Sequence, residues 1–225
     1  MILSKSVINF FSIFSHRSKG RIPARDILGI KLKSIQDYMS ISDIKLPEYV
    51  SWLNMPPGKE HYKLLAYLST RYNNAEIFDI GTHLGYSALA LAHNPNNKVL
   101  SFDIERHGSL PTAENIIYHL ENILTPEGNK VWGERLLASP LIFFDIAPHL
   151  GFLEYDFYIW LRDNNYQGIL VCDDIFYFKE MTDNFWNKVA PEHKLDVTSV
   201  GHWSGTGLIF FNEKSVAAYN FLINA

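Results

Sequence analysis

Three aspartates that follow two apolar runs have the residue type and spacing for metal chemistry. Asp145 lies in "LIFFDIA" (141–147), and Asp173 and Asp174 lie in "GILVCDDI" (168–175). If the two runs are neighbouring parallel strands, the three carboxylates meet at one edge, where like charges repel and raise one another's pKa. A divalent cation relieves that repulsion, and oxygen ligands favour Mg²⁺. The alternative is that Asp174 caps the next helix and Asp145 orients a loop.

Two histidines are candidate general bases near these aspartates. His149 comes four residues after Asp145, and His202 lies next to Trp203 in "GHWSGTG" (201–207). A positioned imidazole can take the proton of a hydroxyl group, and a tryptophan ring suits the apolar face of a sugar. The alternatives are a loop role for His149 and a tight glycine hairpin around a packed tryptophan. Six further histidines have no nearby residues in the sequence that indicate a role, and we expect most of them to be solvated or structural. They are His61, His83, His93, His107, His119 and His193.

A second constellation lies in "EIFDIGTHLGYSALALA" (76–92), where a strand-like run changes into a helix-like one. Glycines at such a turn let the backbone bend tightly and approach a ligand, and the following helix offers free N–H groups. About twenty residues after this turn, Asp103 ends another apolar run, where a carboxylate can accept two hydrogen bonds from a ribose. Together these features predict an adenosine-containing cofactor. The alternatives are a purely structural turn and an ordinary surface or capping acid.

The same turn favours S-adenosylmethionine over a dinucleotide. It lacks the Gly-x-Gly-x-x-Gly spacing that pyrophosphate binding uses. Asp79 opens the loop, where its charge disfavours a phosphate but suits the ammonium group of a methionine. An NAD-type oxidoreductase on a similar sheet is the alternative.

The elements that must position these residues alternate along the chain. Apolar runs predict strands at 75–80, 98–104, 115–120, 141–147, 168–175, 195–200 and 207–212, and helical spacing predicts helices at 59–70, 86–94, 129–139, 153–164 and 180–190. Continuously apolar strands separated by helices indicate a mostly parallel sheet covered on both faces. A short turn joins the last two strands, so they should form an antiparallel hairpin whose turn lies at the cofactor edge.

Over roughly residues 55–215 the chain resembles the class I S-adenosylmethionine-dependent methyltransferases. The segment 76–92 is similar to their first motif, "VLSFDIE" (99–105) to their ribose-binding second motif, and "VTSVGHWSGTGLIFFN" (197–212) to their closing hairpin. The resemblance implies a Rossmann-like α/β fold with a seven-stranded, mostly parallel sheet and helices on both faces.

The resemblance also implies roles for individual residues. Asp103 would hold the ribose, with Glu121 and Asn122 near the adenine. The methionine part would be lined by Asp79, Gly81, Thr82 and Gly85, with Tyr86 and Ser87 at the helix start.

An Asp followed by an Asp-Asp pair resembles the sugar-modifying group of metal-dependent O-methyltransferases. The acceptor would then be a hydroxyl of a sugar, a glycan or a similar polyhydroxylated small molecule. Relatives often place an acid two residues, or a His or Lys three residues, after the first metal aspartate, whereas this chain has Ala147 and Pro148 there. That departure keeps a non-catalytic binding module as a further alternative.

Composition limits the remaining choices. Cys172 is the only cysteine of the 225 residues, which excludes an internal disulfide and a cysteine-based zinc cluster and favours a reducing, cytoplasmic home. Seven basic residues and one acid among the first 35 give +6, so the rest of the chain carries −10 of the total of −4. An acidic body argues against a nucleic-acid partner.

We expect a basic, helical N-terminal segment (1–54) and a methyltransferase domain (55–225). The apolar residues of 2–14 fall at helical spacing. This predicts an amphipathic helix that packs on the body or on a second copy of the chain, or that contacts a membrane surface.

Overall fold

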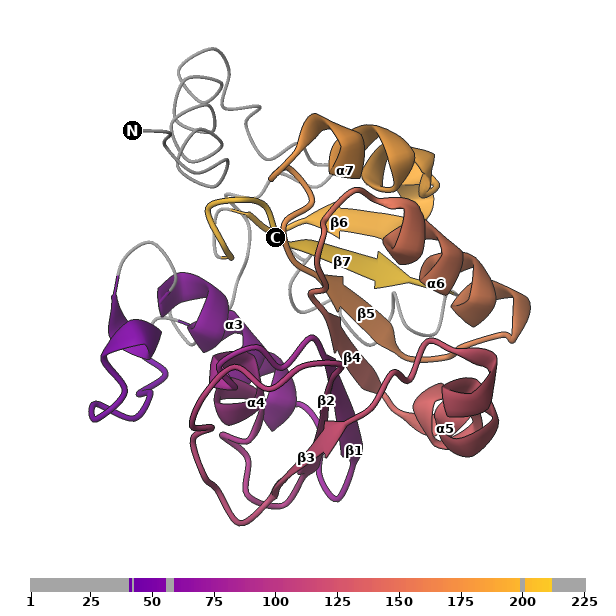
Figure 1. The fold of residues 1–225 in the computed structure, drawn as a ribbon. Helices are drawn as coiled ribbons and strands as arrows, with labels where there is room; N and C mark the ends of the chain where they lie inside the picture. Colours follow the sequence, from indigo (N-terminus) through magenta and orange to yellow (C-terminus); the bar gives the residue numbers. More distant parts are fainter. Residues whose placement is uncertain (1–40, 42, 56–58, 199–200, 212–225) are drawn as a thin grey trace, which may run out of the picture.

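A seven-stranded sheet organises the part of the chain that the computed structural model describes, namely residues 41, 43–55, 59–198 and 201–211 (Figure 1). Its strand order is β3-β2-β1-β4-β5-β7-β6. The strands are β1 (Glu76–Ile80), β2 (Lys98–Asp103), β3 (Ile116–Leu120), β4 (Leu141–Phe144), β5 (Ile169–Cys172), β6 (Lys194–Asp196) and β7 (Gly207–Phe210).

The pairing confirms the predicted topology. The five strands β1 to β5 pair in parallel, for example with Phe78 opposite Ile142, and β7 is antiparallel to both β5 and β6. Because β7 runs against both neighbours, β6 is parallel to the other strands. The turn between β6 and β7 therefore lies at the edge where β1, β2, β4 and β5 have their carboxyl ends.

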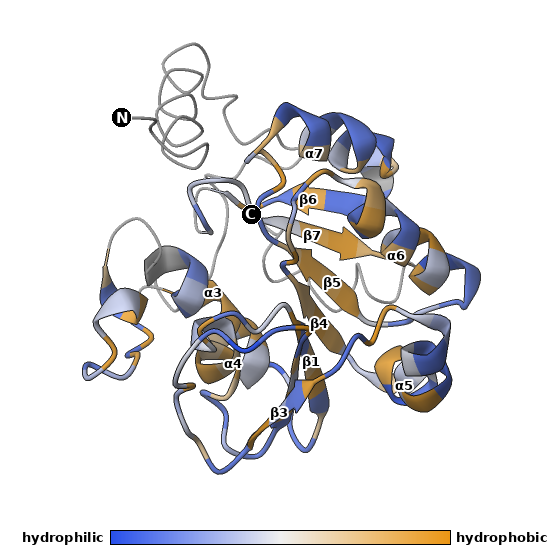
Figure 2. Cartoon of the chain, viewed as in Figure 1, coloured by the Kyte–Doolittle hydropathy of each residue, from blue (hydrophilic) through white to orange (hydrophobic). Residues whose placement is uncertain are grey.

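Helices cover both faces of the sheet because side chains alternate along each strand. In β4, Phe143 belongs to a buried cluster with α3 (Lys59–Thr70) and α4 (Tyr86–Leu91), whereas Phe144 belongs to a second cluster on the opposite face. The second cluster includes residues of α5 (Pro126–Ala138), α6 (Phe152–Asp163) and α7 (Lys179–Asn184). Figure 2 shows hydrophobic β4, β5 and β7 in the centre and hydrophilic residues on the covering helices.

The described residues before α3 pack on the same sheet face. Ile41, Leu46 and Leu53 are buried in the cluster that contains α3, and Ser51–Asn54 forms a short 3₁₀ helix, η2. The predicted amphipathic segment 2–14 lies outside the described residues. None of the described helices is long and apolar enough to cross a membrane.

Several predicted elements have different bounds in the structure. The strands predicted at 141–147 and 168–175 end at Phe144 and Cys172, and the helix predicted at 86–94 ends at Leu91. The helix predicted at 129–139 begins at Pro126, because the Thr125 hydroxyl accepts the Gly128 N–H and caps it. The helix predicted at 180–190 ends at Asn184. Beyond it the backbone leaves helical geometry at Phe185 and continues as a 3₁₀ turn, η3 (Trp186–Lys188).

The strand predicted at 195–200 is also shorter, since β6 spans Lys194–Asp196. The Asp196 carboxylate accepts the backbone N–H of Thr198, which turns the chain into a loop. A further short 3₁₀ turn, η4 (Pro191–His193), precedes β6.

Candidate functional site

A cleft with a volume of about 490 Å³ lies at the carboxyl edge of the sheet. Asp103 and Asn122 line one part of it, and Asp145, His149 and Asp174 line another. In open parallel α/β sheets ligands bind at this edge, and clefts of this size hold small molecules and cofactors. The structure therefore brings residues of both predicted constellations to one cavity.

Asp103 is the last residue of β2, and its carboxylate is held by the backbone. The His83 N–H donates to Oδ2 over 2.7 Å, and the Glu105 N–H donates to Oδ1 over 3.1 Å. Each carboxylate oxygen can accept a further hydrogen bond, so Asp103 keeps capacity for two hydroxyl groups. Ile104 follows it on the cleft wall and is 66% exposed, which offers an apolar surface beside Asp103.

Asp79 is fully buried and does not line the cleft. Its Oδ2 atom accepts a hydrogen bond from the Ser101 hydroxyl, whereas Oδ1 has no hydrogen-bond partner among the described residues. Burial raises the pKa of Asp79 to about 7, against the opposing effect of the Ser101 and Ser87 hydroxyls. Asp79 lines neither the cleft nor the neighbouring pocket, so its predicted contact with an ammonium group remains a prediction.

The two glycines of the turn are needed by the fold itself. Gly81 has φ +101°, and a Cβ there would lie 1.7 Å from the carbonyl oxygen of Asp145. Gly85 has φ +75°, and a Cβ there would lie 2.9 Å from Pro111 Cδ and from the Tyr118 hydroxyl oxygen. A side chain is excluded by neighbouring backbone at Gly81 and crowded by neighbouring side chains at Gly85, and positive φ disfavours one at both positions, so the structural role exists whether or not a ligand binds.

The other predicted cofactor residues lie around this turn. Gly81 lines the cleft, but Gly85, Tyr86 and Ser87 do not. Thr82 lines a smaller neighbouring pocket with Asp103, and its hydroxyl is 2.6 Å from that of Ser101. The predicted contacts of these residues with a methionine group remain predictions.

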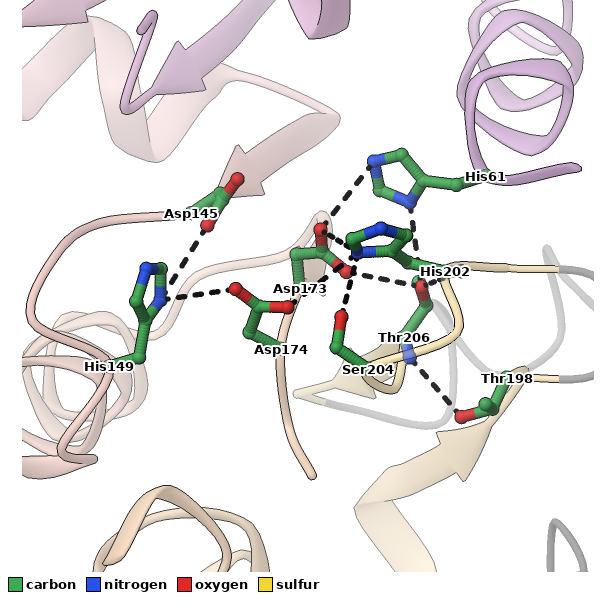
Figure 3. A network of polar contacts seen from close by, with 9 residues as sticks. All are labelled: His61, Asp145, His149, Asp173, Asp174, Thr198, His202, Ser204 and Thr206. Carbon is green, nitrogen blue, oxygen red and sulfur yellow. Dashed lines mark hydrogen bonds and ion pairs between the residues drawn. The ribbon is translucent and has the colours of Figure 1, made fainter. Parts of the chain in front are cut away.

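The three metal-candidate carboxylates form two overlapping groups with histidines. Ligand atoms of Asp145, His149 and Asp174 all lie within 4.8 Å of one another, and so do those of Asp173, Asp174 and His202. The three aspartates do not form such a group by themselves among the described residues. Figure 3 shows Asp174 between the two groups.

Asp173 is buried among polar side chains. Its Oδ2 is 3.0 Å from Nδ1 of His202 and 3.8 Å from Nε2 of His61, and the Thr206 hydroxyl donates to Oδ1 over 3.4 Å. Burial alone would raise the pKa of Asp173, but His61 and His202 hold it below its usual value. Burial likewise opposes the charge of His202, yet Asp173 raises the pKa of that imidazole to about 10.

The expected repulsion among the three aspartates is seen in part, because the pKa of Asp145 is raised whereas that of Asp173 is lowered by the histidines. Burial, which is only partial because the side chain is 32% exposed, and the negative charges of Asp173 and Asp174 raise the pKa of Asp145. His149 Nδ1 lies 3.8 Å from Asp145 Oδ1 and 3.4 Å from Asp174 Oδ2. The His149 ring also contacts Tyr177, with 5.6 Å between ring centroids.

Two histidines at the site were not assigned a role from the sequence. His61 is 3% exposed and stands on α3 three and four residues before the buried Leu64 and Leu65, so the helical period alone places it on the buried face. His83 lies inside the glycine turn and lines the cleft beside His107, with 5.0 Å between ring centroids. The position of His83 between the two glycines of the turn was the sequence signal that could have placed it at the site.

The strand order and the antiparallel β7 match the architecture implied by the sequence motifs. This is a Rossmann-like methyltransferase fold. No protein-family model matches the chain, and no curated protein sequence matches it.

Three solved structures illustrate the likeness in chain path. A Staphylococcus aureus protein described as a candidate caffeoyl-CoA O-methyltransferase has 13% identity and a TM-score of 0.46, covering 91% of this chain and 99% of that one. Cofactor-bound Rv0187 from MTB has 14% identity and a TM-score of 0.46, covering 88% and 95%. The SAH-bound Podospora anserina methyltransferase PaMTH1 has 13% identity and a TM-score of 0.40, covering 94% and 98%. Similarities at this level carry no functional argument, so the function is argued from this protein's own side chains.

Proposed function

We propose that this protein is an S-adenosylmethionine-dependent O-methyltransferase that uses a divalent metal and methylates a hydroxyl of a sugar, a glycan or a similar polyhydroxylated small molecule. One observation carries the proposal. A single cleft joins Asp103, at the end of β2, to Asp145, His149 and Asp174, at the ends of β4 and β5. A cofactor held at one end and an acceptor at the other would have their reacting atoms side by side, which is what in-line transfer requires.

The residues at the cofactor end fit an adenosyl sulfonium ligand. Asp103 is fixed by two backbone N–H groups with acceptor capacity left over, and Ile104 offers an apolar surface next to it. Beneath the loop, Asp79 has an unpaired carboxylate oxygen. We therefore assign the ribose to Asp103 and the ammonium of the methionine part to Asp79.

The residues at the acceptor end fit a hard or borderline cation. Carboxylates at the ends of β4 and β5 would hold it, and a bound ion would supply Lewis-acid polarisation of an acceptor hydroxyl. Tyr177 and Trp203 do not line the cleft but lie near its acceptor end, because the Tyr177 ring is 5.6 Å from that of His149 and 6.1 Å from that of Trp203. Aromatic rings suit the C–H faces of a sugar ring.

The two candidate general bases differ in their surroundings. With a pKa near 10, His202 is an imidazolium at neutral pH and donates to Asp173 rather than accepting a proton. His149 lines the cleft, whereas His202 does not. These surroundings support His149 rather than His202 as the histidine near the acceptor.

Calorimetry with S-adenosylhomocysteine tests the cofactor assignment. Asp103→Ala removes a carboxylate that would bind two ribose hydroxyls, which should cost about 2 kcal/mol, or about 30-fold in affinity. Asp156→Ala, an exposed aspartate on α6, is the matched control and should leave the affinity unchanged. Unchanged affinity in Asp103→Ala would remove this residue from the site.

The same titration separates the alternatives. Binding of NAD without binding of S-adenosylhomocysteine would favour an oxidoreductase. Cofactor binding with no transfer of a labelled methyl group to any of a panel of sugars and polyhydroxylated compounds would favour a non-catalytic module. Mass spectrometry of glycans and small metabolites from cells with and without the gene would identify the acceptor by the gain of one methyl group.

A contact of residues 2–14 with a membrane surface or with a second copy of the chain is a separate proposal. It rests on the apolar spacing and on the basic charge of the first 35 residues. Binding of the full chain to anionic and neutral vesicles, compared with its sedimentation in solution, would distinguish the two partners.

A further inference from the structure

Asp174 stands between two groups of side chains, each of which offers enough ligand atoms for a metal ion. Asp145 and His149 lie on one side of it, and Asp173 and His202 lie on the other (Figure 3). Two ligands that are each about 2.1 Å from an ion are about 3.0–3.6 Å apart when they subtend angles of about 90–120°. Both groups have the size for one ion, so their other contacts must decide between them.

The group around His202 is already internally paired. His202 Nδ1 is 3.0 Å from Asp173 Oδ2 and 2.7 Å from the hydroxyl oxygen of Ser204, so this nitrogen has no lone pair directed at an additional partner. Asp173 is 4% exposed, and neither it nor His202 lines the cleft. An ion held by Asp173 and His202 would therefore not face the cleft.

The group around His149 is open and loosely paired. Asp145, His149 and Asp174 all line the cleft. The 3.4 Å and 3.8 Å separations between His149 Nδ1 and the two carboxylates are too long for good hydrogen bonds, and the ring makes no hydrogen bond among the described residues. Separations of this size are close to those between neighbouring ligands of one ion.

The two carboxylate oxygens of Asp174 face different groups. The residue is only 8% exposed, and its buried Oδ1 atom accepts no hydrogen bond from the described residues. Nδ1 of His202 pairs with this atom over 3.6 Å, whereas the atom that faces His149, over 3.4 Å, is Oδ2. Oδ2 is therefore the Asp174 atom that would contact an ion in the cleft, and the unpaired Oδ1 does not decide between the two groups.

We propose that the metal site of the cleft consists of Asp145, His149 and Asp174, and that Asp173 is a positioning residue for His202 rather than a ligand. The proposal rests on the function proposed above and replaces Asp173 of the sequence-based expectation with His149. An imidazole beside two carboxylates favours the borderline ions Fe²⁺, Co²⁺ and Zn²⁺, and also Mn²⁺, over Mg²⁺. As a ligand through Nδ1, His149 cannot accept the acceptor's proton at that atom.

Manganese binding to the full-length protein, without cofactor or acceptor, tests this ligand set. Pulsed electron paramagnetic resonance of bound Mn²⁺ should show a coupling to a histidine nitrogen. His149→Gln should remove that coupling and weaken Mn²⁺ binding at least tenfold. His202→Gln should keep the coupling, and Asp173→Asn should change the affinity by less than threefold. His93→Gln, an exposed histidine outside the cleft, is the matched control.

Three results would overturn the proposal. They are a wild-type Mn²⁺ signal with no nitrogen coupling, a coupling lost in His202→Gln but kept in His149→Gln, and wild-type protein that binds no Mn²⁺. The first result requires no variant and so does not depend on how a variant folds. Calorimetry of S-adenosylhomocysteine in the presence of a chelator tests the proposed function independently of the metal ligands, because cofactor affinity should not need the ion.

Discussion

The buried carboxyl of Asp79 should make cofactor binding depend on pH. Its pKa is raised to about 7 by burial, and its Oδ1 atom has no hydrogen-bond partner among the described residues. If the ammonium group of the cofactor binds this carboxylate, only the ionised form binds well. Below the raised pKa, binding must therefore release a proton from Asp79, which weakens the apparent affinity.

The size of the effect follows from the fraction of Asp79 that is ionised. With a pKa near 7, about one tenth of the protein is ionised at pH 6 and about nine tenths at pH 8. The affinity for S-adenosylhomocysteine should therefore rise about tenfold between these pH values, equivalent to about 1.4 kcal/mol. Asp79→Asn should bind more weakly and lose this dependence, whereas Asp103→Asn should bind more weakly and keep it.

Calorimetry at pH 6, 7 and 8, in buffers of different ionisation enthalpy, measures both the affinity and the proton released. An affinity that does not change over this range in wild-type protein, or that changes equally in Asp79→Asn, would refute the ammonium contact.

Stability gives a second reading of Asp79. The pKa of Asp79 in the folded protein lies above its ordinary value of 3.8. At pH values between these two pKa values, the folded state therefore binds more protons than the unfolded state. Without cofactor, the free energy of unfolding should then fall as the pH rises from about 4 to 7. In Asp79→Asn this part of the fall should be absent in urea denaturation.

Three further predictions concern the turn, the buried histidine and the ion. Gly81→Ala should destabilise the fold by more than about 3 kcal/mol, because its Cβ would lie 1.7 Å from the Asp145 carbonyl oxygen. Gly108→Ala is the control, since Gly108 has a similar positive φ but nothing within 4 Å of the added Cβ, and it should cost about 1 kcal/mol. Equal losses of the two variants in urea denaturation would contradict the steric argument. His61→Ala should cost about 2–3 kcal/mol of folding free energy, because it leaves a cavity beside Asp173. His93→Ala, at an exposed position, should cost less than about 0.5 kcal/mol. A similarly small loss in His61→Ala would contradict a structural role for this buried histidine. A chelator should abolish methyl transfer and leave S-adenosylhomocysteine affinity nearly unchanged, with activity returning on addition of Mn²⁺; full activity in excess chelator would exclude metal assistance.

Much of the fold could be predicted from the sequence because its signals are local. Apolar runs such as "LIFF" and "ILVC" gave the strands, and the short turn before Gly207 gave the antiparallel pair. Side-chain capping decided the element ends that were predicted less well. The Thr125 cap begins α5 earlier than apolar spacing alone indicates, and the Asp196 turn ends β6 early.

The sequence by itself also predicted the sheet edge at which the acids lie, because a carboxylate after a parallel strand must lie at that strand's carboxyl end. It could not determine how Asp145, Asp173 and Asp174 divide among histidines. His61 comes from a helix more than 100 residues before Asp173, and His202 comes from the final hairpin. Only the packing of α3 and the β6–β7 turn against β5 brings both rings to Asp173 and leaves His149 facing the cleft, since contacts between distant segments depend on the whole arrangement and not on spacing along the chain.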